Sequence, residues 1–155
     1  MSNKAEQAIE IAEKITELYE TTRLLEYEPY EYQKRFHDAK DMGGRLARQR
    51  LLMAANKTGK TFCGASEMAF HLTGRYPKWW QGARFSRPIT AWAAGNTTAN
   101  TRDIVQAELL GEPGDEDEFG KGAIPRQYIS GPPLRMPGVP NAYLLYFFFV
   151  MLVRI

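Results

Sequence analysis

The stretch LLMAANKTGKTF, residues 51–62, carries the strongest signal for the fold of this chain. An apolar run passes into a short polar loop, and apolar residues then return with the spacing of a helix. A loop of the pattern G-x-x-x-x-G-K-[ST] between a strand and a helix is typical of a phosphate-binding loop. Ala54 stands in place of the first glycine, while Gly59, Lys60 and Thr61 match the end of the pattern.

Each matching residue of the loop has a chemical task. Gly59 permits a turn whose N–H groups point inward, at the start of a helix that stabilises anions. The ammonium of Lys60 reaches the β- and γ-phosphates, and the hydroxyl of Thr61 is placed to bind Mg²⁺. The alternative is a plain glycine-containing turn with an exposed lysine. The loop residues predicted to bind a nucleotide are Ala54, Asn56, Lys57, Thr58, Gly59, Lys60 and Thr61.

Outside the loop, the apolar spacing predicts an alternation of helices and strands. A stripe at three- and four-residue spacing indicates an amphipathic helix over 4–25. Strand, helix, strand and helix in this order favour a parallel sheet covered by helices. Strands are predicted at 45–56 and 89–96. Helices are predicted at 61–72, ended by Gly74, and at 97–111, with Thr97 or Thr98 as the N-cap and Gly111 at the end. A long loop is predicted at 111–141, with a short strand at 126–130.

Composition excludes several classes of protein. The 155 residues suit one domain, and a net charge of +2 is too small to indicate nucleic-acid binding from bulk charge. The single cysteine, Cys63, excludes an internal disulfide, fits a reducing cytoplasm and is interpreted as a small core residue. His37 and His71 offer no zinc spacing and are interpreted as surface or packing residues. The apolar tail at 143–155 is shorter than the roughly 20 residues of a membrane span.

The loop RYPKWWQGARFSRP, residues 75–88, supports two interpretations. Trp79, Trp80 and Phe85 alternate with Lys78 and Arg84, a combination that can stack on nucleic-acid bases and pair with phosphates. The same aromatic rings can instead anchor the loop against the core. The sequence leaves both interpretations open.

Over roughly residues 28–140 the sequence resembles the N-terminal ATPase domain of the large terminase subunits of tailed bacteriophages. PYEYQKRFHDA looks like the adenine-recognition segment of that family, in which Gln33 would contact the base edge and Tyr30 would pack on the base. AANKTGKT looks like its Walker A loop, where alanine often replaces the leading glycine. WAAGNTTANTRDIVQAELLG and GKGAIPRQYI are similar to the segments that follow.

The resemblance implies a P-loop NTPase-type parallel sheet with flanking helices, of which this chain would hold an incomplete N-terminal part. It divides the chain into an amphipathic helix (1–27), a partial ATPase domain (28–142) and an apolar tail (143–155) that is a truncated strand or non-native. The implied function is binding of ATP and Mg²⁺ to power translocation of double-stranded DNA into a procapsid, in the cytoplasm of an infected bacterial cell. The implied partners are DNA, the portal and the small terminase subunit, in an oligomeric ring without a membrane.

Two departures from the family pattern limit the expected activity. Lys57 stands where the family often carries an arginine that senses the γ-phosphate, and lysine lacks the planar fork of arginine. An apolar strand ending in Asp-Glu, which would hold Mg²⁺ for hydrolysis, is not found, and a nuclease domain has no room. We therefore expect a fragment that binds ATP without hydrolysing it alone. The alternatives are a helicase-like ATPase, a small-molecule kinase, or an inactive remnant.

Overall fold

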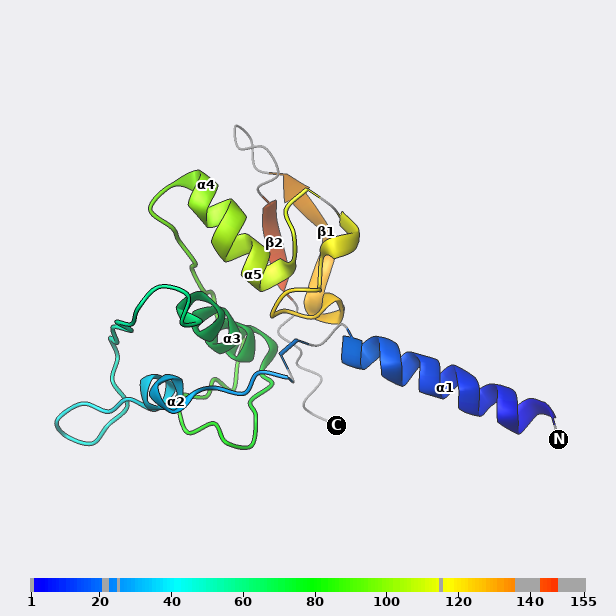
Figure 1. Cartoon of the computed structure of the whole chain (residues 1–155), viewed down its shortest axis with the longest axis horizontal. Helices are drawn as coiled ribbons and strands as arrows, with labels where there is room; N and C mark the ends of the chain where they lie inside the picture. Colours follow the sequence, from blue (N-terminus) through cyan, green and yellow to red (C-terminus); the bar gives the residue numbers. More distant parts are fainter. Residues whose placement is uncertain (1, 21–22, 25, 115, 136–142, 148–155) are drawn as a thin grey trace.

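The computed structural model describes residues 2–20, 23–24, 26–114, 116–135 and 143–147. Figure 1 shows a group of short helices, a small sheet beside them and one long helix that projects away. The elements are α1 (Ser2–Glu20), α2 (Glu31–His37), α3 (Lys60–Thr73), α4 (Thr98–Asn100), a π-helical turn (Thr101–Gln106), α5 (Ala107–Leu110), 3₁₀ turns (Glu116–Glu118 and Arg126–Tyr128), β1 (Ile129–Arg135) and β2 (Tyr143–Phe147).

Helix α3 lies at the centre of the core, and its prediction is confirmed. Gly59 and Gly74 flank it with φ angles of 79° and 68°, in the left-handed region that glycine adopts most easily. The predicted apolar side is buried at Ala65 and Ala69, and Phe62 packs against the same cluster. The larger side chains of this cluster are Leu24, Tyr27, Phe70, Leu72, Trp80, Leu109, Leu110, Phe119, Ile124, Tyr128 and Ile129.

The helix predicted to end at Gly111 is also confirmed, running over 98–110 with a π-helical middle. Thr97 is its N-cap, because the Oγ1 atom accepts a hydrogen bond from the Asn100 amide at 3.1 Å. Gly111 ends it with a φ of 115°. α5, the last part of this helix, packs against α3 (Figure 1). The helix that follows the predicted strand at 89–96 therefore lies beside the helix that follows the loop at 54–61.

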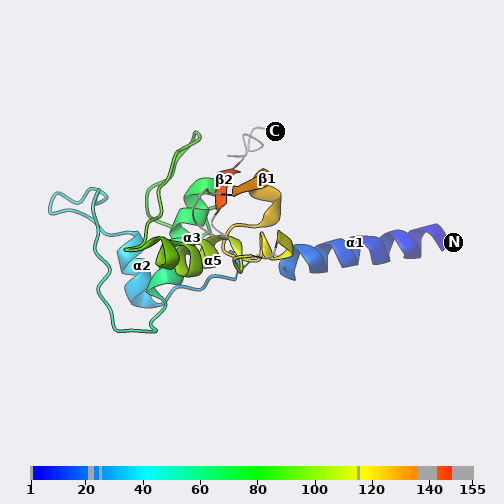
Figure 2. The ribbon, with the colours of Figure 1, turned by 90° about the horizontal axis from the view of Figure 1, so that it is seen from above.

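Helix α1 spans Ser2–Glu20, so the predicted helix is confirmed but ends earlier than residue 25. It extends away from the rest of the molecule in both ribbon views (Figure 2), and Ile11 and Ile15 of the predicted stripe are exposed. Leu18, Tyr19, Thr22 and Leu25 lie outside the residues whose side chains are described. Among the described helices, α1 included, none has the length and apolarity to cross a membrane.

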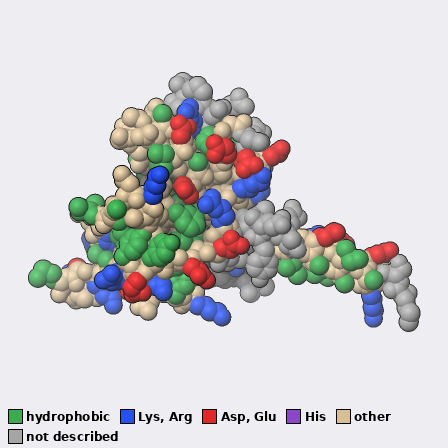
Figure 3. All heavy atoms as spheres, in the orientation of Figure 1, with side chains coloured by type: hydrophobic (Ala, Val, Ile, Leu, Met, Phe, Trp, Pro, Cys, Tyr) green, Lys and Arg blue, Asp and Glu red, His purple; other side chains and the backbone are tan. Residues whose placement is uncertain are grey.

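The two predicted strands of the parallel sheet, 45–56 and 89–96, belong to no sheet within the described part of the chain, where Leu46 forms an isolated antiparallel bridge with Lys40. Leu51 and Met53 are 80% and 81% exposed and Trp92 is 89% exposed, and hydrophobic side chains gather at the surface over the helices (Figure 3). A strand buried on both faces requires neighbours for its N–H and C=O groups. Neither segment is part of a sheet among the described residues, and the parallel sheet stays a prediction.

The sheet that the structure does describe is antiparallel and has two strands. β1 pairs with β2, with Ile129 opposite Phe147 and Arg135 opposite Tyr143. The short strand predicted at 126–130 therefore begins only at Ile129, because 126–128 form a 3₁₀ turn. The first part of the apolar tail forms β2, while residues 148–155 lie outside the described residues.

Candidate functional site

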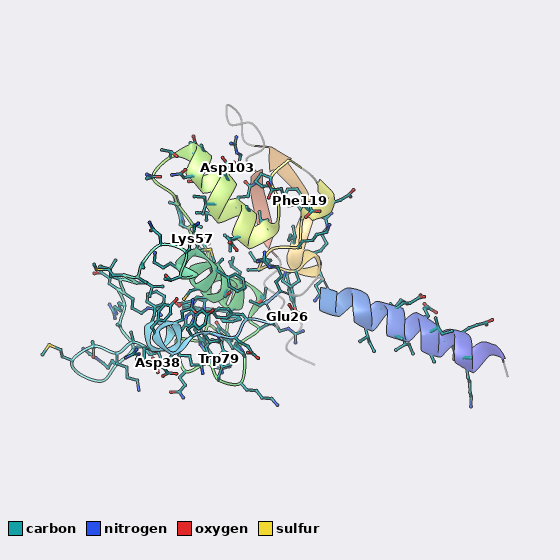
Figure 4. The ribbon with its side chains drawn as sticks, in the orientation of Figure 1. Glu26, Asp38, Lys57, Trp79, Asp103 and Phe119 are labelled. Atoms are coloured by element: carbon teal, nitrogen blue, oxygen red, sulfur yellow. The ribbon has the colours of Figure 1, made fainter. Side chains whose placement is uncertain are left out.

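The loop at 54–61 makes a tight turn before α3. Lys57 has a φ of 60° and Gly59 a φ of 79°, so two residues of the loop adopt the left-handed conformation. A non-glycine residue in that region is uncommon and marks a backbone that its surroundings hold in place. Thr58 contributes to this by donating its hydroxyl to the Ala55 carbonyl at 2.8 Å. Figure 4 shows Lys57 on the loop that leads into α3.

Lys60 folds back onto the start of the loop. Its ammonium donates to the carbonyl oxygens of Ala54 and Ala55 at 2.8 and 2.5 Å. Hydrogen bonds of an ammonium to phosphate are stronger than those to a neutral carbonyl, so an anion can replace these two acceptors. Thr61 follows Lys60 in the first turn of α3 and is exposed, and Asn56 and Lys57 are exposed in the loop itself.

Helix α2 brings the predicted base-recognition segment to the loop. Gln33 is 2% exposed, donates its Nε2 to the Gly59 carbonyl at 3.2 Å and accepts the Tyr30 amide at 2.9 Å. Tyr32, which the sequence did not single out, donates its hydroxyl to the Thr58 carbonyl. Tyr30 is 67% exposed and its ring stacks on Tyr32, with centroids 6.0 Å apart. The structure thus joins residues 30–33 to the loop.

A buried polar cluster lies directly under α2 and was not predicted. Glu67 of α3 accepts the Nδ1 proton of His37 at 2.7 Å, both guanidinium arms of Arg50, and lies 3.5 Å from the Nε2 atom of His71. Burial raises the pKa of the Glu67 carboxyl, but the hydrogen bonds from these three residues outweigh it and hold the pKa well below its usual range. Glu67 is therefore a buried carboxylate.

Arg50 connects this cluster to the end of α2. Its Nη1 donates to the carbonyl oxygens of Phe36 and His37 at 3.0 and 3.1 Å, and its guanidinium lies 4.9 Å from the Phe36 ring centroid. These carbonyls belong to the last turn of a helix, where no N–H group of the helix itself is left to donate to them. Arg50 also stands immediately before the apolar run that enters the loop.

His37 and Cys63 pack in the core, as interpreted from the sequence. His37 is 2% exposed, and its Nε2 lies 3.0 Å from the Tyr27 hydroxyl and 3.5 Å from Cys63 Sγ. Burial raises the pKa of the Cys63 thiol, which leaves it a small core residue rather than a nucleophile. The spacing of Glu67 and His71 on one helix face was the available sequence signal for this cluster. Among the described residues no group of side chains is arranged to hold a metal ion.

The aromatic residues of the 75–88 loop anchor it against the core. Trp80 is 4% exposed and donates its Nε1 to the Ala83 carbonyl at 3.0 Å. Trp79 lies beside α2 and α3 (Figure 4), with its ring 5.7 Å from that of His37. Phe85 remains exposed, and Arg84 lies over the Tyr76 ring. Trp79 and Trp80 therefore anchor the loop against the core, which is the second of the two interpretations of this loop.

Comparisons with known proteins show the family of this chain. The family model described as the N-terminal region of the terminase large subunit, T4likevirus type, matches residues 51–138. The chain belongs to the terminase large subunit family. The large terminase subunit of Salmonella phage P22 is 40% identical over 139 residues, covering 80% of this chain and 27% of that protein. This terminase chain thus spans about a quarter of the length of that relative, and no solved structure matches it.

Proposed function

We propose that this chain binds ATP with Mg²⁺ on the 54–61 loop, as part of the ATPase of a motor that packages double-stranded DNA into a procapsid. The observation that carries the proposal is the hydrogen bond from Gln33 to the Gly59 carbonyl. This single contact joins the segment predicted to recognise the base, at Gln33, to the loop predicted to bind the phosphates, at Gly59. Family membership supports the packaging role, because the relatives are large terminase subunits.

The phosphates would lie on the loop and the adenine beside α2. Lys60 would exchange the Ala54 and Ala55 carbonyls for phosphate oxygens, and the amides of residues 57–61 would donate to the same oxygens. Thr61 would bind the Mg²⁺ ion, and Lys57 would approach the γ-phosphate as a point charge. Tyr30 offers an exposed ring on which the base can stack.

A base-side glutamine also separates this proposal from a small-molecule kinase. An amide side chain can pair with the donor and acceptor that adenine presents together at its N6 and N7 atoms. Gln33 is buried on the Tyr30 amide and the Gly59 carbonyl, so its side chain would turn outward to make this pair. We propose that hydrolysis and DNA movement require further carboxylates and an oligomeric ring with the portal and the small terminase subunit. The place of action would be the cytoplasm of the infected bacterium.

Substitution Lys60→Ala tests the proposal directly. We expect calorimetric titration with Mg·ATP to give measurable binding for the parent chain and at least a tenfold weaker affinity for the variant, since a charged hydrogen bond contributes about 1.5–3 kcal/mol. Lys40→Ala removes a surface lysine outside the loop and serves as the matched control. Equal affinity of the parent and the Lys60→Ala variant would refute the assignment of the loop.

A further inference from the structure

Helix α2 is held at both ends by groups outside itself. Its first turn is tied to the loop by Tyr32, which donates to the Thr58 carbonyl, and by Gln33, which donates to the Gly59 carbonyl at 3.2 Å. Its last turn is tied to Arg50, which donates to the Phe36 and His37 carbonyls. A helix of seven residues is too short to be stable alone, so these outside contacts determine where it lies.

Glu67 holds Arg50, the residue that binds the C-terminal end of α2. It receives both arms of Arg50 and the Nδ1 proton of His37, and the residue is only 7% exposed. A bidentate arginine–carboxylate pair has one preferred geometry, and burial removes the water that would compete for it. The Glu67 carboxylate therefore helps to set the distance from α3 to the end of α2, together with the packing of His37 against Trp79 and Trp80.

We infer that Arg50, Glu67 and His37 form a positioning device that aligns α2 with the loop and thereby fixes the place from which Gln33 would turn to the base of a bound nucleotide. None of the three contacts the loop at 54–61 in the described structure; they act through the helix that Gln33 occupies. The inference rests on the proposed function, because it assumes that a nucleotide base lies beside Gln33. It adds that base selection depends on a buried ionic cluster at the opposite end of the helix.

Base selection gives a measurement that general loss of stability does not change. Adenine presents a donor at N6 beside the N7 acceptor, whereas guanine presents two acceptors, so an aligned carboxamide favours ATP over GTP. We expect a preference of about tenfold for the parent chain, the effect of roughly one hydrogen bond. A partly unfolded population weakens the apparent affinity for both nucleotides by the same factor. The ratio of the two dissociation constants therefore reports alignment alone.

Two variants and one control test the cluster. Arg50→Lys keeps the positive charge but loses the two-armed guanidinium. Glu67→Gln keeps the shape of the side chain but loses its negative charge. Asp41→Asn makes the same acid-to-amide change in an exposed pair with Arg45, whose Nε lies 3.2 Å away. We expect the ATP-to-GTP preference to fall to about twofold or less in both cluster variants and to stay unchanged in the control. A full preference in both cluster variants would overturn the inference.

A second measurement works without nucleotide and separates the two proposals. The Tyr30 amide donates to the Gln33 side chain, so its hydrogen exchange reports whether that side chain is held in place. We expect at least about tenfold faster exchange of this amide in Arg50→Lys, with the α3 amides unchanged. Unchanged exchange at Tyr30 would refute the positioning role even if ATP binds. Faster exchange in a chain that binds no ATP would support the positioning role and refute the proposed function.

Discussion

At the scale of single residues, Glu67 shows how a buried charge makes stability depend on pH. Its pKa in the folded chain lies below the value of about 4.3 expected when unfolded. The folded state then binds fewer protons than the unfolded state, so stability is fully present above the unfolded pKa and is lost as pH falls toward the folded pKa. We expect the free energy of unfolding, measured with urea, to drop steadily below about pH 5.

The Glu67→Gln variant isolates this carboxylate. Removing one partner of a buried ion pair leaves Arg50 without its counter-charge, which costs about 3–5 kcal/mol. We expect the variant to be less stable than the parent at pH 7 and the difference to shrink between pH 5 and pH 3. The Asp41→Asn control should track the parent at every pH, because the Asp41 and Arg45 pair is exposed. A constant difference across this range would assign the loss to packing rather than charge.

At the scale of elements, the end of the helix at 98–110 depends on one glycine. Gly111 has a φ of 115°, and a Cβ atom built there would lie 2.0 Å from the Glu118 carbonyl oxygen. Gly111→Ala therefore meets both backbone strain and a clash, and we expect a loss of about 1–3 kcal/mol in the free energy of unfolding.

Gly64→Ala is the matched comparison for that substitution. Gly64 lies inside α3, and a Cβ atom there would have nothing within 4 Å. Alanine favours a helix interior over glycine, so we expect a gain of about 0.5–1 kcal/mol in the same urea experiment. Equal effects of the two substitutions would contradict the strained conformation at Gly111.

The elements that could be predicted from sequence are those whose limits are local. Gly59 and Gly74 bound α3, and Thr97 caps the next helix, because caps act within one turn of their own residue. The buried cluster could not be predicted in the same way, since His37 and Arg50 lie 30 and 17 residues from Glu67.

At the scale of the whole molecule, the segments 51–55 and 89–96 are predicted strands that belong to no sheet among the described residues. Both were predicted as strands from apolar runs, and both are mostly exposed in the described structure, although Ile89 packs against the core. The terminase relative from phage P22 is longer, with this chain covering 27% of it. We propose that these segments are strands of a parallel P-loop sheet whose other strands come from sequence that follows in the relative.

Hydrogen exchange on a chimera tests that proposal. On this proposal, fusing the matched part of this chain to the remaining sequence of the phage P22 subunit would supply strands that pair with the two apolar segments. We expect amides at 51–55 to exchange fast in the 155-residue chain and roughly a hundredfold slower in the chimera, because ladder hydrogen bonds protect them. Amides of α3 should be protected in both and report that the chimera is folded. If α3 is protected while 51–55 still exchange fast, those residues are a surface segment and the loop at 54–61 is held by α2 and α3 alone.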